Sequence, residues 1–454
     1  MSLRSLLAAL VVAGGLVGGL AGCASGPDLT PINGPLTGQA GSSRLEPRDL
    51  GLSGEAVALA FSGGGARAAA FSYGALLELR DRRRPDGRRW IDQVAFVTGV
   101  SGGALTAAWF GLHGPDGLDG FRPALLDKDW QAAVHDRLLW PANWPRLRDG
   151  GLNGRDRIAG WLAREVYGEA RMSDLSGPPV ILNATELSSG LPFAFAAPWF
   201  DALCSDLGGV RLADAAAASA AYPFAVRPVV LETFNRDCAR PLPDWTTQAA
   251  QARDGSMAAR DTARSFQAFR DPQRLRYVHL LDGGVVDNFG LSSLTILQLA
   301  SGRPYGPLLS AGDAVRLRRL RVIVVNGERI TERPWGRTPD GPDGRRIMEA
   351  VADHSTDAAK RNAYDVFRER LAEWERRTVA WRCALSSQEA AALGAPPGWD
   401  CADLRYSVEA IAFADLPPER AHVLLRIPTR LSLDAAQTDL SQQAGRDAVA
   451  AVFP

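Results

Sequence analysis

The spacing of apolar and polar residues predicts a strand and a helix twice in succession, beginning near residue 56. Residues 56–61 form a short apolar run, which is typical of a buried strand, and glycines 63–65 interrupt it. A helix is predicted over residues 66–80, a second buried strand over residues 94–98, and a second helix over residues 104–112. This order of elements predicts a parallel α/β sheet with right-handed crossovers.

The same patterns continue to the end of the chain. Further strands are predicted over residues 180–184, 277–281, 320–325, 406–413 and 423–427, and helices over residues 212–221, 345–381 and 434–452. Residues 245–272 are rich in Arg, Asp, Gln and Ala, and we interpret them as an excursion or a mobile surface segment. The expected fold class is α/β, with a mainly parallel central sheet flanked by helices.

The first residues have the pattern of an export signal. Arg4 precedes an apolar run over residues 6–21, which at about 16 residues is shorter than the roughly 20 of a membrane span. The following Leu20-Ala21-Gly22-Cys23 resembles the lipobox of bacterial lipoproteins, in which cleavage precedes a cysteine that is then acylated. We therefore predict a signal peptide over residues 1–22 and lipidation of Cys23; the alternative is an ordinary signal peptide with an incidental cysteine.

Residues 23–51 are predicted to be a flexible tether between this lipid anchor and the folded body, because Gly, Ser, Pro and Thr dominate there. By resemblance to sorted lipoproteins, Ala24 after the cysteine indicates the outer membrane, facing the periplasm. The folded body is divided into a catalytic domain over residues 52–330 and a helical C-terminal extension with late strands over residues 331–454. The late strands need a sheet to join, so we expect this extension to pack on the same domain.

Composition excludes some classes of function. The chain of 454 residues has 51 basic and 51 acidic side chains, so it lacks the basic surplus that nucleic-acid binding usually requires. Four cysteines follow the anchor, and the expected pairs are the local ones, Cys204–Cys238 and Cys383–Cys401, with free buried thiols as the alternative. No Cys/His cluster has metal-ligand spacing, so neither a metal nor a cofactor is expected.

Gly99-Val100-Ser101-Gly102-Gly103 fits the pattern G-x-S-x-G between a predicted strand and a predicted helix. A tight turn in that place exposes the serine hydroxyl, and the following helix directs backbone N–H groups towards it. Ser101 is therefore the candidate nucleophile. The alternative is a glycine-rich turn that carries a serine without a catalytic role.

Ser62-Gly63-Gly64-Gly65-Ala66-Arg67 also lies between a strand and a helix. Consecutive glycines allow close approach of the backbone to a ligand, and they can turn several N–H groups towards a phosphate or an oxyanion. The segment lacks the Gly-Lys-Ser/Thr ending of a P-loop, and no acidic residue follows as a dinucleotide site requires. Arg67 could attract a phosphate headgroup or serve only the packing of the helix.

Asp282 ends the predicted strand over residues 277–281 and is followed by two glycines. The carboxyl ends of strands are where α/β sheets place their sites, although Asp-Gly is also common in ordinary turns.

Together the three motifs resemble the patatin-like phospholipase family over roughly residues 57–291. In that family the glycine-rich loop forms the oxyanion hole, G-x-S-x-G carries the nucleophile, and Asp-Gly-Gly carries the catalytic aspartate. Further agreement lies in Asn183-Ala184-Thr185-Glu186 with Gly190, in residues 218–224, and in Asp287-Asn288. One departure is Ala68, where many members have glycine.

The resemblance implies a three-layer αβα fold and a Ser101–Asp282 dyad, in which Asp282 is the base. The N–H groups of Gly63, Gly64 and Gly65, with Gly102, would stabilise the oxyanion, and Asn288 is a candidate orienting residue. The histidines offer no convincing third member of a triad, and a structural or surface role is expected for each of them: His113, His135, His279, His354 and His422.

The expected function is hydrolysis of ester-linked fatty acids in phospholipids or lysophospholipids, beside the membrane that holds the lipid anchor. A carboxylesterase or thioesterase with the same site is one alternative. A non-catalytic envelope lipoprotein that uses the fold for binding is the other. The sequence gives no indication of protein partners.

Overall fold

The apolar run at residues 56–61 becomes a central strand of the sheet. The computed structural model describes residues 29–36, 47–131, 155–223, 226–236, 238–329, 333–337, 339 and 341–453. Within these residues an eight-stranded sheet has the order β10-β9-β2-β3-β4-β8-β7, with β5 paired to β4. The strands are β2 (Gly54–Phe61), β3 (Val94–Val100), β4 (Val180–Glu186), β5 (Leu191–Ala194), β7 (Val229–Glu232), β8 (Tyr277–Asp282), β9 (Leu317–Asn326) and β10 (Arg405–Ala412).

Neighbouring strands from β10 through β9, β2 and β3 to β4 are parallel. Strands β5 and β8 are antiparallel to β4, and β7 is antiparallel to β8. All of β3 and residues 56–61 of β2 are buried, which accounts for their uninterrupted apolar sequences, since both faces of a parallel sheet are covered. The expected α/β class with a mainly parallel central sheet is therefore confirmed.

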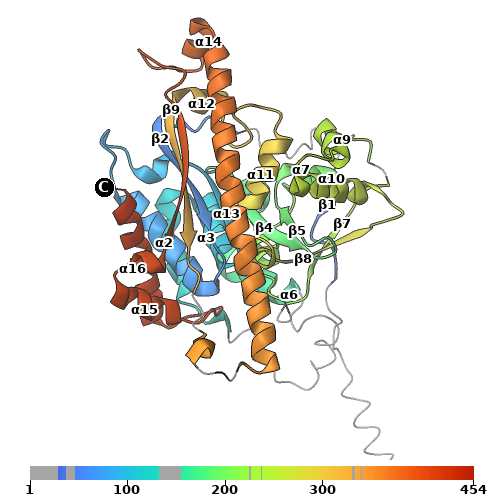
Figure 1. The fold of residues 1–454 in the computed structure, drawn as a ribbon, viewed down its shortest axis with the longest axis vertical. Coiled ribbons are helices and arrows are strands. Elements are labelled where there is room, and N and C mark those ends of the chain that lie inside the picture. The colour runs from blue at the N-terminus through green and yellow to red at the C-terminus, as the bar shows by residue number, and fades with distance from the viewer. Residues whose placement is uncertain are drawn as a thin grey trace, which may run out of the picture.

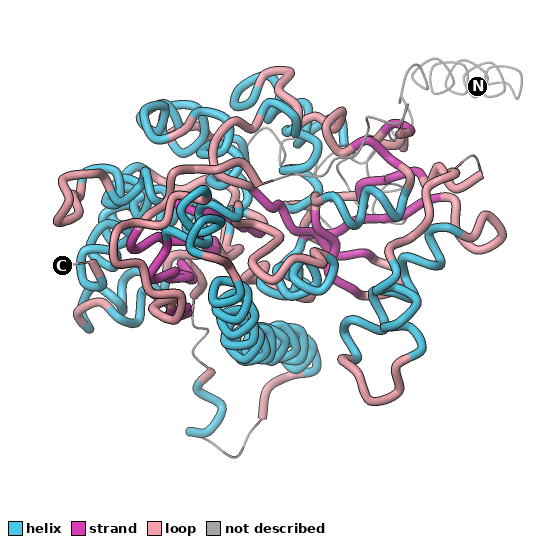
Figure 2. Tube along the Cα trace, turned by 90° about the horizontal axis from the view of Figure 1, so that it is seen from above, coloured by secondary structure: helices cyan, strands magenta, loops and turns pink. Residues whose placement is uncertain are grey.

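Helices cover both faces of this sheet (Figures 1 and 2). The chain moves along the sheet in one direction from β2 to β4 and in the opposite direction from β9 to β10. Right-handed crossovers then put α2 (Gly65–Asp81) and α3 (Gly102–His113) on one face, and α13 (Gly344–Ala384) on the other. The direction changes between β9 and β2, so the carboxyl ends of these strands are where a doubly wound sheet places its ligands.

The remaining α-helices surround this core. They are α6 (Arg155–Leu162), α7 (Ala197–Leu203), α8 (Leu212–Ser219), α9 (Asp244–Gln251), α10 (Met257–Arg270), α11 (Leu291–Ala300), α12 (Ala311–Arg316), α14 (Ser387–Ala392), α15 (Pro418–Arg426) and α16 (Ala435–Val452). Within the described residues, no helix combines the length and the apolarity that crossing a membrane requires.

Two expectations from the sequence are wrong. Residues 245–272 are not a surface excursion but contain helices α9 and α10, and α10 buries Phe266 and Phe269 almost completely. Residues 423–427 are not a strand, because α15 starts at Pro418 and covers all of them except Ile427, which caps its end. Proline has no N–H to leave unpaired at a helix start, and the amphipathic spacing of α15 buries Leu424.

The C-terminal third packs on the preceding part of the chain in two places. Strand β10 extends the sheet beside β9, and α16 lies along α2 (Figure 1). Glycines allow the two helices to approach closely: a Cβ on Gly74 would lie 1.9 Å from the carbonyl oxygen of Gln442, and one on Gly445 would lie 2.0 Å from that of Phe71.

Gly74→Ala is therefore expected to lower the free energy of unfolding by about 1–3 kcal/mol, the usual range for overpacking. Its matched control is Gly160→Ala in α6, where the new methyl group meets only the flexible end of Arg164 at 3.4 Å. Urea unfolding of both variants would check the prediction. Equal stability of Gly74→Ala and wild type would contradict the α2–α16 packing.

The structure contains disulfides between Cys204 and Cys238 and between Cys383 and Cys401, which are the local pairs expected from the sequence. The first ties the end of α7 to the segment after β7. The second ties the end of α13 to the segment before β10.

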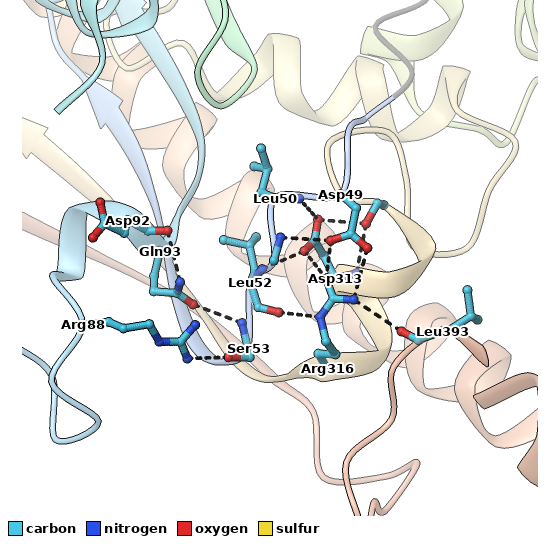
Figure 3. A network of polar contacts seen from close by, with 12 residues as sticks. Asp49, Leu50, Leu52, Ser53, Arg88, Asp92, Gln93, Asp313, Arg316 and Leu393 are labelled. Carbon is cyan, nitrogen blue, oxygen red and sulfur yellow. Dashed lines mark hydrogen bonds and ion pairs between the residues drawn. The ribbon is translucent and has the colours of Figure 1, made fainter. Parts of the chain in front are cut away.

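Most of the predicted tether, together with the signal peptide and Cys23, lies outside the described residues, but its described parts bind the folded body. Strand β1 (Gly34–Pro35) pairs with β6 (Ser205–Asp206). Before β2, the carboxylate of Asp313 accepts hydrogen bonds from the N–H groups of Leu50 and Leu52, at 3.1 and 2.8 Å (Figure 3). The folded body therefore begins earlier than residue 52.

Candidate active site

Ser101 lies in a sharp turn between β3 and α3. Its backbone has φ 51° and ψ −121°, in a region that non-glycine residues rarely adopt. No side chain fits at the two following glycines. A Cβ on Gly102 would lie 2.1 Å from the Gly65 carbonyl oxygen, and a Cβ on Gly103 would lie 2.5 Å from the Phe61 carbonyl oxygen. The turn thus presses against the glycine-rich loop, and the strain is of the kind found at functional sites.

A buried polar network supports this turn. The hydroxyl of Ser219, on α8, accepts a hydrogen bond from the Ser101 N–H at 3.0 Å and donates one to the Asn183 carbonyl at 2.5 Å. The Asn183 amide in turn donates to the Thr98 hydroxyl and to the Gly99 carbonyl, at 2.7 and 2.9 Å. Sequence reasoning noted the segments that contain Ser219 and Asn183 but gave neither residue a role, because these partners come from distant parts of the chain.

Asp282 ends β8 beside Ser101. Its N–H donates to the Ala221 carbonyl at 2.9 Å, and its carbonyl accepts from the Thr185 hydroxyl at 2.8 Å, so the backbone is held on both sides. Its carboxylate accepts a hydrogen bond from the Gly284 N–H at 2.8 Å. Burial raises the pKa of Asp282 to about 6, although hydrogen bonds from the Ser101 side chain and the Gly284 backbone lower it in part. A carboxylate with this pKa is a better proton acceptor than an exposed aspartate and is still ionised at neutral pH.

The glycine-rich loop contributes fewer donors than the sequence predicted. The Gly63 N–H donates to the Asn288 carbonyl at 3.2 Å, so it is already engaged and the expectation for Gly63 is corrected. The N–H groups of Gly64, Gly65 and Gly102 have no acceptor within the part of the chain that the structure describes. Gly64 and Gly65 have φ of 136° and 65°, conformations that glycine adopts without strain.

Arg67 does not face the site. Its side chain is buried, with its Nε donating to the Gly327 carbonyl at 2.9 Å and its Nη2 donating to the Thr429 hydroxyl at 3.3 Å. Its Nη1 donates to the Ile427 carbonyl. Arg67 therefore fastens α2 to the segments after β9 and α15. A role in headgroup binding is excluded for it, because all three nitrogens have backbone or hydroxyl partners inside the protein.

Asn288 does reach the site. It is buried, and its side-chain oxygen faces Gly63, where an added Cβ would lie 2.3 Å away. Its neighbour Asp287 has a structural role, because its carboxylate accepts from the N–H groups of Phe289 and Ser292 at the start of α11, at 3.1 and 2.6 Å.

The described histidines do not take part. His113 packs against Trp109 with ring centroids 4.0 Å apart and the rings tilted by 35°. The backbone carbonyl of His279 accepts a hydrogen bond from the Leu187 N–H. His354 lies on the exposed side of α13 and His422 on that of α15, while His135 is outside the described residues. Among the histidines that the structure describes, none has a hydrogen bond to Ser101 or Asp282.

Cavity size does not locate this site. A cavity of about 750 Å³ surrounds the Cys204–Cys238 disulfide, and neither Ser101 nor Asp282 lines it. No group of His, Cys, Asp and Glu side chains in the described residues has the arrangement of a metal site.

A strained serine between a parallel strand and a helix, next to a buried carboxylate, is the arrangement of a serine acyl hydrolase on an α/β sheet. The chain belongs to the patatin-like phospholipase family: the family model matches residues 59–295, just over half of the chain. That range contains the glycine-rich loop, Ser101 and Asp282.

Comparison with solved structures gives distant similarities. One is to human GIVD cytosolic phospholipase A2, at 14% identity and a TM-score of 0.31, covering 59% of this chain and 45% of that one. Another is to the same human enzyme in complex with methyl gamma-linolenyl fluorophosphonate, at 14% identity and a TM-score of 0.36, covering 87% and 57%. The chain thus spans about half the length of these structures. Among curated proteins, the sequence has no match.

Proposed function

We propose that this protein is a serine acyl hydrolase that releases ester-linked fatty acids from phospholipids or lysophospholipids. The observation that carries the proposal is that the strand register sets the buried carboxylate of Asp282 beside Ser101, a serine whose own backbone is strained. The pKa of Asp282, which a hydrogen bond from the Ser101 side chain lowers in part, agrees with this placement. Membership of a phospholipase family supports the substrate class.

The proposed reaction has two halves. Asp282 accepts the hydroxyl proton while the Ser101 oxygen attacks the ester carbonyl, and the N–H groups of Gly64, Gly65 and Gly102 stabilise the oxyanion. The proton then passes from Asp282 to the leaving alcohol, which leaves an acyl-enzyme on Ser101. In the second half, Asp282 accepts a proton from water while the water attacks the acyl carbonyl. The proton then passes from Asp282 to the Ser101 oxygen as the bond to the acyl group breaks, so the hydroxyl and the carboxylate are both restored and the fatty acid departs.

The surroundings of Asp282 favour an apolar substrate. Tyr222 follows Ala221, whose carbonyl accepts a hydrogen bond from the Asp282 N–H, and its side chain is 64% exposed. Val285 ends the Asp-Gly-Gly turn and is 41% exposed. Large apolar side chains that are exposed and next in sequence to residues of the site are suited to contact with acyl chains.

The test is release of fatty acid from purified phosphatidylcholine, lysophosphatidylcholine and p-nitrophenyl butyrate, with Ser101→Ala as the blank. Cleavage of the two lipids by wild type supports the proposal. Cleavage of the p-nitrophenyl ester alone would replace it with a carboxylesterase or thioesterase activity. No cleavage of any of the three would favour a binding protein and contradict the enzyme.

We also propose that Cys23 is acylated and holds the protein at the outer membrane, facing the periplasm, in a bacterial cell. The support is the Leu20-Ala21-Gly22-Cys23 sequence behind an uncharged apolar run. Cys23→Ala is expected to move the protein from the membrane fraction to the soluble fraction of a bacterial lysate, because the acyl chains supply the attachment. Ser25→Ala, two residues after the cysteine, is the matched control and should not change the fraction. If Cys23→Ala stays in the membrane fraction, the anchor is elsewhere.

A further inference from the structure

Asn288 contacts both parts of the site that must be aligned for catalysis. Its carbonyl accepts the Gly63 N–H at 3.2 Å, and its side-chain oxygen lies against the loop at Gly63 and against the Asp-Gly-Gly turn at Gly284. A Cβ added to Gly63 would lie 2.3 Å from the Asn288 side-chain oxygen, and one added to Gly284 would lie 2.6 Å from it. The Cβ added to Gly63 would also lie 3.3 Å from the Ser101 Cβ. One side chain therefore sets the spacing between the glycine-rich loop and the turn that carries the base.

Glu328 fixes the orientation of the Asn288 amide. It follows β9, and its Oε1 accepts a hydrogen bond from the Asn288 Nδ2. The flipped amide would bring two oxygens together, so this contact directs the Asn288 oxygen towards Gly63 and Gly284. The side chain of Glu328 is only 17% exposed, so its charge is weakly screened by water.

Lys360, in the middle of α13, supplies the compensating charge. Its ammonium pairs with the other carboxylate oxygen of Glu328, and the Lys360 side chain is only 14% exposed. It is also 2.9 Å from Asp357 and 5.7 Å from the ring centroid of Phe289. Burial lowers the pKa of Lys360, but its interactions with Glu328 and Asp357 together outweigh burial and raise the pKa overall, so the ammonium keeps its charge at neutral pH.

The charge of Glu328 reaches the glycine-rich loop. The loop lies against the residue that precedes Glu328, because a Cβ on Gly64 would lie 3.1 Å from the Gly327 carbonyl oxygen. A carboxylate attached one residue further along therefore acts on the oxyanion that would form at Gly64 and Gly65. Without Lys360, this negative charge would oppose the developing one.

We propose that Asn288, Glu328 and Lys360 are positioning residues that connect helix α13 to the oxyanion loop, with Lys360 neutralising the carboxylate that orients Asn288. The inference rests on the proposed acyl hydrolase function. It assigns to α13, which lies outside the range of the family match, a part in that chemistry.

The experiment measures kcat for p-nitrophenyl butyrate per active site, with active sites counted by fluorophosphonate titration. Lys360→Met is expected to lower kcat about tenfold with KM changed less than about twofold, because the opposed charge acts on the transition state. Glu328→Gln keeps an acceptor for Asn288 without the charge, so it should retain kcat within about threefold. In the double variant, Glu328→Gln should restore the kcat of Lys360→Met to within about threefold of wild type.

Three controls make the outcome decisive. Lys128→Met removes a surface lysine paired with Glu165 and should leave kcat unchanged, while Lys360→Arg should retain most of it. If Lys360→Met does not fold, Lys360→Gln replaces it with a similar chain length. A purely structural role would lower the number of titrated sites but not kcat per site, and would give additive losses in the double variant; either result overturns the inference. Failure of wild type to react with the fluorophosphonate or the ester would instead overturn the proposed function.

Discussion

Ser101→Gly is expected to abolish hydrolysis and, at the same time, to raise the free energy of unfolding. The loss of activity follows from removal of the nucleophile, and a fall in kcat of at least about 10⁴-fold is usual for such a change. The gain in stability follows from the backbone, because φ 51° and ψ −121° are accessible to glycine but cost about 1–3 kcal/mol in other residues. Glycine also has more conformational freedom in the unfolded chain, which offsets part of this gain. A net increase of about 1 kcal/mol in the free energy of unfolding is therefore expected.

Ser101→Ala is the matched control for this prediction. It removes the same hydroxyl and keeps a Cβ, so it should be equally inactive without the gain in stability. Urea unfolding and kcat for p-nitrophenyl butyrate measure the two effects separately. If the glycine and alanine variants are equally stable, the turn is not strained in the way its dihedral angles indicate.

Asp282→Asn is expected to lower kcat by about 10³–10⁴-fold, a loss typical of replacing an acid–base carboxylate by its amide. Asparagine occupies the same space and still accepts the Gly284 N–H, but it cannot take the Ser101 proton. In wild type, kcat/KM should rise with pH and reach its plateau above an apparent pKa of about 6, since only the ionised carboxylate acts as a base.

The raised pKa of Asp282 also determines how stability depends on pH. The folded state holds the proton up to about pH 6, whereas the unfolded chain releases it near 3.8. This group therefore favours folding most below the unfolded value, and the contribution is lost as pH rises through about 6. Asp282→Asn should accordingly be more stable than wild type at pH 8, by up to about 3 kcal/mol, and similar to it at pH 4. A variant that is less stable at pH 8 would contradict the burial of an ionised carboxylate.

The sequence was most informative where the chemistry depends on neighbouring residues. The glycine-rich loop and the serine turn follow the parallel strands β2 and β3, and the alternation of strands and helices is enough to place these two strand ends at one edge of the sheet. Asp282 ends β8, which is antiparallel to β4, so its place beside Ser101 depends on the register that pairs Ala184 with Asp282 and Asn183 with Val100. The apolar runs of β2 and β3 were equally clear, because strands that are buried on both faces are apolar at every position and do not alternate with polar residues.

The sequence failed where a residue's role depends on partners from distant parts of the chain. Arg67 follows the loop, yet its acceptors are near residues 327 and 427, so local sequence could not show that it points away from the site. The Gly63 N–H is engaged by Asn288 for the same reason. Glu328 and Lys360 carry no motif, and only the packing of α13 against the end of β9 brings them together.

The strand predicted over residues 423–427 was wrong for a different reason. A short apolar run fits a strand or one side of a helix equally well, and only its context decides. In α10 the buried residues follow helical spacing, but most are small and charged residues lie between them. The segment was therefore interpreted as exposed on the surface.

The proposed chemistry depends most on the activation of Ser101 by Asp282. The most direct test is reaction with a fluorophosphonate, followed by mass spectrometry of the intact protein and its peptides. We expect a single adduct, located on Ser101, whose rate of formation rises with pH through about 6. The same adduct should form at least about 10²-fold more slowly in Asp282→Asn. An adduct on another residue, or labelling of Asp282→Asn at the wild-type rate, would contradict the dyad.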